Sequence, residues 1–115
     1  MLRFTGIAVV TSFVFAATST HAAECNVEIA EAKIDAAVNA EVITDLAMLN
    51  GIPTVAVDPS TWDQMIFSTR LGLVETIECA VAGPGSILAR IQIIEPGGKV
   101  MANFDGLTRE LDVVR

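Results

Sequence analysis

The sequence predicts an α+β fold in which a disulfide-stapled hairpin of two helices packs on one face of an antiparallel β-sheet with three strands, or with four. Three observations predict this fold. Apolar residues recur at helical spacing up to Ala82 and alternate along the chain after Gly85. The breaker Gly83-Pro84-Gly85 separates these two patterns. Two cysteines, Cys25 and Cys79, fall where antiparallel helices would bring them together.

The first 22 residues have the layout of a secretory signal peptide. One cation precedes an apolar run from Phe4 to Ala17, and small residues then suit cleavage after Ala22, with Ala23 as the alternative site. The apolar run covers about 14 residues, whereas a membrane-spanning helix needs roughly 20, so a cleaved signal is favoured over an anchor. The sequence therefore predicts one small mature domain, residues 23–115, in the periplasm or secreted.

Cys25 and Cys79 are the two cysteines of the chain. An oxidising compartment pairs cysteines, and a bridge between these two closes a loop of about 54 residues, which the chain-entropy estimate values at roughly 4 kcal/mol. A redox-active pair is the alternative, but such pairs are usually spaced CxxC. The sequence therefore favours a structural disulfide.

The charge balance excludes two classes of partner. The formal net charge is −7, and removal of the signal with Arg3 takes it to −8. The remaining cations are scattered singly, whereas nucleic acids and anionic lipids are bound by clustered Lys and Arg. We therefore expect no nucleic-acid partner and no membrane association after cleavage.

The segment from Glu24 to Asn50 reads as one long helix. It is rich in alanine, lacks Gly and Pro, and repeats apolar residues every four positions from Ala30 to Leu46. Gly51 supplies the expected helix end. The β-prone run from Thr54 to Val57 then reads as an edge strand or an extended link.

A second helix is predicted from Ser60 to Ala82. Ser60 is the expected N-cap, with Asp63 three residues on as in a capping box. Trp62 begins an apolar stripe with a wide arc, so this helix is expected to be the more buried one. Gly72, inside the helix, indicates close packing against a neighbour.

Three strands are expected after the breaker. Alternating apolar residues predict strands over residues 87–95, 99–104 and 107–115. Pro96-Gly97-Gly98 is a turn, and Asp105-Gly106 is typical of a type I′ hairpin. The expected sheet is therefore an antiparallel meander.

The chemistry of the mature chain is restricted by missing residue types. The chain has no tyrosine, and its one histidine, His21, lies in the expected signal peptide. Histidine-dependent catalysis, histidine-ligated zinc and histidine pH sensing are thereby excluded. The sequence predicts no catalytic residue, no metal site and no cofactor.

Carboxylates are the remaining candidates for chemistry. Asp58 and Asp63 flank the start of the second helix, and Glu75 and Glu78 lie three residues apart near its end. Such pairs do acid-base work or hold hard cations. We favour structural roles, with Asp58 and Asp63 as turn and cap residues and the glutamates exposed, paired with Arg70 or Arg90.

Two surfaces are candidates for binding. The outer face of the sheet is expected to carry Leu88, Ile94 and Met101 among charged residues, as a surface for a protein partner or for self-association. Trp62 is either an interface anchor or a core residue, and its place one turn into an amphipathic helix favours the core. The leading hypothesis is a small exported, non-catalytic binding protein of the bacterial envelope. The alternative is a small carboxylate-dependent enzyme or cation-binding protein.

Overall fold

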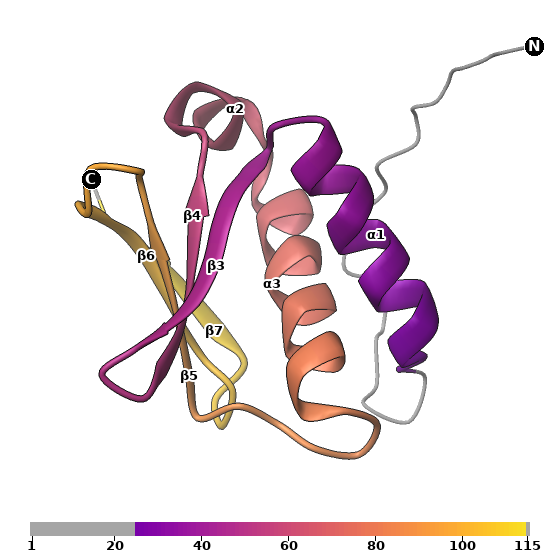
Figure 1. Cartoon of the computed structure of the whole chain (residues 1–115). Helices are drawn as coiled ribbons and strands as arrows, with labels where there is room; N and C mark the ends of the chain where they lie inside the picture. Colours follow the sequence, from indigo (N-terminus) through magenta and orange to yellow (C-terminus); the bar gives the residue numbers. More distant parts are fainter. Residues whose placement is uncertain (1–24, 115) are drawn as a thin grey trace, which may run out of the picture.

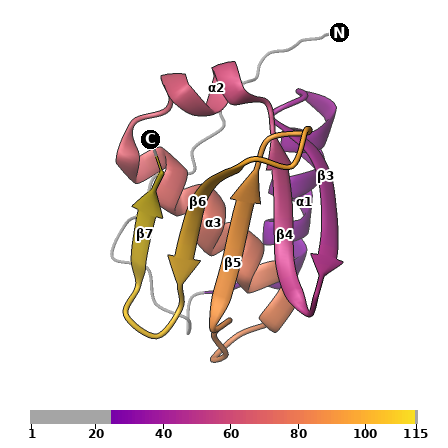
Figure 2. The same ribbon diagram turned by 90° about the vertical axis from the view of Figure 1, so that its left-hand side faces the viewer.

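The computed structural model describes residues 25–114. The predicted signal peptide, residues 1–22, lies outside them. In chain order, the described elements are α1 (Val27–Asn39), β3 (Ile43–Leu49), β4 (Ile52–Val57), α2 (Pro59–Gln64), α3 (Phe67–Ala82), β5 (Arg90–Ile94), β6 (Val100–Asp105) and β7 (Glu110–Val113). Figure 1 shows α1 and α3 together on one face of the sheet, and Figure 2 shows the opposite face uncovered by helices.

The described sheet has five strands in the order β3-β4-β5-β6-β7. Neighbouring strands are antiparallel except for β4 and β5, which pair in parallel from Thr54 opposite Gln92. The expected purely antiparallel sheet of three or four strands is thus corrected to a mixed sheet of five. The parallel pair arises because α2 and α3 form a crossover between β4 and β5, and parallel neighbours require such a long connection.

Only the first half of the long helix predicted for residues 24–50 is helical. The α-helix α1 ends at Asn39, Glu41 has a left-handed backbone with φ 63°, and the chain continues into β3. The β-branched run from Val42 to Thr44 favours a strand over a helix. Asn50-Gly51, with φ values of 54° and 77°, forms the two-residue turn between β3 and β4.

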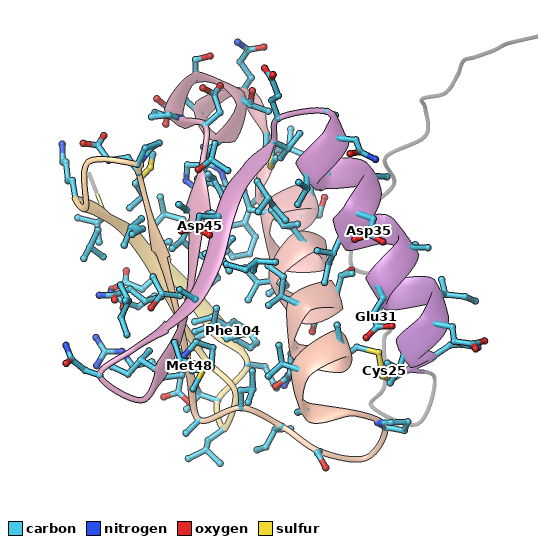
Figure 3. All side chains as sticks on the ribbon, viewed as in Figure 1. Cys25, Glu31, Asp35, Asp45, Met48 and Phe104 are labelled. Carbon is cyan, nitrogen blue, oxygen red and sulfur yellow. A yellow bond between two sulfur atoms is a disulfide. The ribbon has the colours of Figure 1, made fainter. Side chains whose placement is uncertain are left out.

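The two principal helices run in opposite directions and are joined where the sequence predicted. Cys25 and Cys79 form a disulfide with their Cα atoms 5.6 Å apart. Figure 3 shows Cys25 at the start of α1. The stapled α+β fold is therefore confirmed, but α1 and α3 are not a hairpin, because β3, β4 and α2 lie between them in the chain.

The predicted second helix is two helices. Met65 and Ile66 adopt extended backbone conformations, with ψ values of 138° and 162°, and separate α2 from α3. The N-cap of α2 is Asp58 rather than Ser60, because Pro59 occupies the first helical position. Gly72 is buried within α3, as expected for close packing.

The core lies between the sheet and the two long helices. The residue pairs Val55–Ile93 and Ile91–Phe104 place side chains from three neighbouring strands on the helix-covered face. Figure 3 shows Phe104 on this side of the sheet. The fully buried members of the core cluster include Trp62, Leu73, Val74 and Ile77 from the helices and Ile43, Val55, Val57, Ile91, Ile93, Ala102 and Phe104 from the sheet.

The strands β5 and β7 are shorter than the alternating patterns suggest. The strand β5 begins at Arg90, because the preceding segment from Ile87 to Ala89 forms a loop between α3 and the sheet. The strands β6 and β7 are joined by a four-residue loop rather than a type I′ turn. Asp105 Oδ1 accepts hydrogen bonds from the amides of Leu107 and Thr108, and Arg109 takes the left-handed conformation.

Candidate functional site

Asp58 is engaged in local structure at the start of α2. Its carboxylate Oδ2 accepts hydrogen bonds from Thr61 Oγ1 at 2.8 Å, from the Thr61 amide at 3.0 Å and from Ser60 Oγ at 3.2 Å. The side-chain hydrogen bond from Thr61, aided by the Thr61 amide, holds the pKa of Asp58 below its ordinary value. Asp63 is exposed on α2. The geometry of Asp58 fits a helix cap.

The cap gives Asp58 a pH-dependent effect on stability. Because its folded pKa lies below the ordinary 3.8, its contribution is present above that pH and is lost as the pH falls through the folded value. We expect Asp58→Ala to lower the melting temperature at pH 7 and the difference from wild type to shrink below pH 3.8. Calorimetry of Asp58→Ala, with Asp63→Ala as the control, tests this. A difference that is the same at both pH values would contradict the role of the carboxylate.

Trp62 belongs to the core rather than to an exposed platform. Its side chain is 1 % exposed, and the guanidinium of Arg70 lies over its ring, 5.1 Å from the centroid. Arg70 Nε also donates to the Trp62 carbonyl at 3.0 Å. The indole Nε1–H finds no acceptor within residues 25–114. These contacts occupy Arg70, one of the two cations expected to pair with the glutamates of α3.

The three residues expected on the outer sheet face lie in different surroundings. Leu88 precedes β5 and packs, half-buried, against the core cluster, as does Met101 on β6. Ile94 is half-buried and follows Ile93, which faces the core, so it points to the uncovered face. A bulge between Ile93 and Ile94 disturbs the alternation with β6. Ile94 and Met101 thus both lie where β5 and β6 pair around this bulge, whereas Leu88 lies beyond the other end of β5.

Glu75 and Glu78 meet a cation that the spacing did not identify, Arg109 in the loop between β6 and β7. Arg109 Nη2 lies 2.9 Å from both Glu75 Oε2 and Glu78 Oε1, and Arg109 Nη1 donates to Glu78 Oε2 at 3.0 Å. Hydrogen bonding to Glu78 raises the pKa of Arg109. The other expected partner, Arg90, instead donates to Asn103 Oδ1 at 3.1 Å.

Glu78 is the centre of this network and is only 5 % exposed. Its Oε2 also accepts a hydrogen bond from the Leu88 amide at 2.9 Å. A buried carboxylate is costly unless it is paired and hydrogen-bonded, and here both conditions hold. The network thus connects the end of α3, the loop before β5 and the hairpin of β6 and β7. Arg109 also lies over the Phe104 ring, 5.1 Å from its centroid.

A shallow, open groove runs beside this network, between the start of α3 and the sheet edge formed by β7. Its lining residues are Phe67, Arg109, Glu110, Leu111 and Asp112, and its volume is about 490 Å³. The charge of Arg109 is offset by the two glutamates of α3. Neither Glu110 nor Asp112 forms an ion pair within the described residues. The net charge lining the groove is therefore negative.

Phe67, which lines this groove, and its chain neighbour Ile66 are both large, apolar and exposed. Ile66 is 69 % exposed and Phe67 is 52 % exposed. Ile66 is the N-cap of α3 and provides no side-chain hydrogen bond to the helix. Isoleucine is among the poorest N-cap residues, and replacing a good cap costs about 1 kcal/mol. The sequence pattern missed this pair because it treated both residues as part of one continuous helix.

Within residues 25–114, no three His, Cys, Asp or Glu side chains converge in a way that would hold a metal ion. No helix in the same range is long and apolar enough to cross a membrane. Comparison of the chain with protein-family models, with curated proteins and with solved structures found no match.

Proposed function

We propose that this chain is a small exported, non-catalytic protein of the bacterial envelope that binds an extended segment of another protein in the groove beside β7. The Cys25–Cys79 disulfide supports export, because disulfides persist in oxidising compartments. The observation that carries the binding proposal is the exposed pair of Ile66 and Phe67, of which Phe67 lines the groove.

The exposed pair breaks two local rules at once. A poor N-cap residue occupies the start of α3, and two large apolar side chains meet water at adjacent positions. Positions that break local rules without a visible structural gain are expected at functional sites. A partner that covers Ile66 and Phe67 would bury these apolar side chains and so provide the stabilisation that the isolated chain lacks there.

The edge of β7 indicates how the partner binds. The amide of Val114 donates to the Met101 carbonyl, and Asn103 lies opposite Asp112. By the alternation of an antiparallel ladder, the backbone groups of Leu111 and Val113 therefore point away from β6. An extended segment laid along β7 would pair with them and place side chains against Phe67.

The charge of the groove defines the chemistry of the segment. Glu110 and Asp112 line the groove, and Arg109 is already neutralised by its carboxylates. The complementary segment alternates apolar residues, which cover Phe67 and Leu111, with basic residues, which pair with the acids. Catalysis has no role in this arrangement.

A pair of synthetic peptides tests the proposal. One alternates valine and lysine over about six residues, the length of a typical strand, and the other replaces lysine by glutamate. We expect the lysine peptide to bind at least about tenfold more tightly, measured by fluorescence anisotropy. Phe67→Ala is expected to weaken binding about tenfold, as for an aromatic anchor.

The control for Phe67→Ala is Ile29→Ala, which removes an exposed apolar side chain from α1. It should leave the affinity unchanged. Equal binding of the two peptides, or no effect of Phe67→Ala, would rule out the groove as the binding site. The variant Asp112→Lys should reduce the preference for the lysine peptide.

A further inference from the structure

The two edges of the sheet are unlike each other. The strand β7 has four residues, and two of them, Glu110 and Asp112, are acids. The strand β3 has seven residues, and six of these are exposed. A short strand that carries two acids disfavours pairing with a second copy of this acidic chain, whereas a long and mostly apolar edge strand favours it. The edge of β3 is therefore better suited than the edge of β7 to pairing with a second copy of the chain.

The exposed side chains of β3 are mostly apolar. Leu46, Met48 and Leu49 are all large and exposed, with Met48 61 % exposed at the hairpin end. Figure 3 shows Asp45 and Met48 along this strand. Leu46 lies opposite Val55 in the register with β4. Leu46 and Met48 therefore project on the same side of the sheet as the core residue Val55, at a place where little else covers them.

The backbone of β3 offers unpaired groups in a defined pattern. The two-residue turn at Asn50-Gly51 makes Leu49 and Ile52 a hydrogen-bonded pair. By alternation, the N–H and C=O groups of Leu46 and Met48 point away from β4. The Leu46 amide is instead bound by its neighbour, Asp45 Oδ1, at 2.9 Å. Asp45 thus caps one donor of an otherwise open edge.

A second copy of the chain matches this edge. In an antiparallel pairing centred on Ala47, Leu46 of each copy lies opposite Met48 of the other, and their outward backbone groups form hydrogen bonds with each other. Asp45 of each copy lies opposite Leu49 of the other, so the two aspartates are well separated. A register shifted toward Asp45 would bring the two acids within diagonal reach and include the bulge between Ile43 and Asp45.

We propose that two copies of this chain associate by antiparallel pairing of their β3 strands about Ala47, giving one continuous sheet across the dimer. The pairing buries Leu46 and Met48 against each other and displaces the Asp45 carboxylate from the Leu46 amide. The β3 edge is distinct from the groove beside β7, so the dimer proposal and the groove proposal are tested independently. Apolar contact and backbone hydrogen bonds across the interface oppose the electrostatic repulsion between two acidic molecules.

Sedimentation equilibrium over a range of concentrations tests the association. We expect a dimer for wild type, a dissociation constant raised at least tenfold by Met48→Lys, and a tighter dimer for Asp45→Asn, which removes the charge beside the new interface. Ile29→Lys is the matched control, because it places the same charge at an exposed apolar position on α1, outside β3. A monomer at every concentration, or a dimer unaffected by Met48→Lys, overturns the proposal.

Cross-linking tests the register without relying on that variant. Residues opposite each other in a non-hydrogen-bonded antiparallel pair have Cα atoms about 4.5 Å apart, within the range that a disulfide bridges. Ala47→Cys should therefore give a covalent dimer on a non-reducing gel. Thr44→Cys, three residues from the symmetry axis, should not. Cross-linking of both variants or of neither contradicts the pairing about Ala47.

Discussion

Replacing both Cys25 and Cys79 by serine is expected to lower the free energy of unfolding by roughly 4 kcal/mol. The disulfide joins residues 54 positions apart, so its loss returns a long loop to the unfolded chain. The disulfide also holds α1 against the rest of the fold, because α1 itself contributes few buried residues. Urea unfolding followed by the fluorescence of Trp62, the one tryptophan of the chain, measures the change.

Wild-type protein in reducing agent is the control, because it keeps both sulfur atoms and loses only the bond. Its unfolding midpoint should fall to nearly that of the double serine variant. Hydrogen exchange should then show α1 opening before α3, since α1 buries only Ala30, Ile34 and Ala37. An unchanged midpoint in both samples would mean that the disulfide adds nothing to the stability of the fold.

The disulfide was predictable because two independent patterns agreed on it. The number of cysteines and their expected compartment suggested pairing, and helical spacing placed Cys25 and Cys79 at matching helix ends. The partition of the chain into helices first and alternating strands last also gave the α+β class. These features follow from local periodicity, which a single sequence displays directly.

The hairpin of β3 and β4 was not predicted, because the sequence features typical of strands overlap there with an apolar repeat typical of a helix. Ala30, Ile34 and Val38 establish a four-residue repeat that Val42 and Leu46 continue by coincidence. The stronger signals were the β-branched residues around Ile43 and the dipeptide Asn50-Gly51. Gly51 is typical of a helix end, but Asn followed by Gly is also a common two-residue hairpin turn.

The placement of β4 depended on tertiary contacts that no local pattern contains. Proline lacks the amide donor of a sheet ladder, so Pro53 is a residue that a central strand normally avoids. The structure accommodates it because pairing between β4 and β5 begins at Thr54, one residue later. The partner of Glu75 and Glu78 was likewise unpredictable, since Arg109 lies more than thirty residues away in the sequence.

Gly106→Ala is expected to lower the free energy of unfolding by about 3 kcal/mol, the upper range for inserting a group into a packed site. A Cβ atom at this buried glycine would overlap the Leu88 carbonyl oxygen and lie 2.8 Å from the Leu88 carbonyl carbon. The obstacle is backbone, so relief requires the loop before β5 to move. Urea unfolding of the variant measures the cost.

Gly106→Ala should also disturb the hydrogen bonds of Glu78. The added Cβ would lie 3.0 Å from Glu78 Oε2, the atom that accepts from the Leu88 amide and from Arg109. Moving Leu88 away removes one of these donors from a buried carboxylate, which adds to the steric cost.

Gly97→Ala is the matched control, because a Cβ there meets only Glu95 Oε1, at the ordinary contact distance of 3.5 Å. It should change stability by no more than about 0.5 kcal/mol. Combining Gly106→Ala with Arg109→Met should cost less than the sum of the two single changes, because both disturb the same carboxylate. Equal effects of Gly106→Ala and Gly97→Ala, or strict additivity with Arg109→Met, would show that Glu78 does not couple the loop before β5 to the hairpin of β6 and β7.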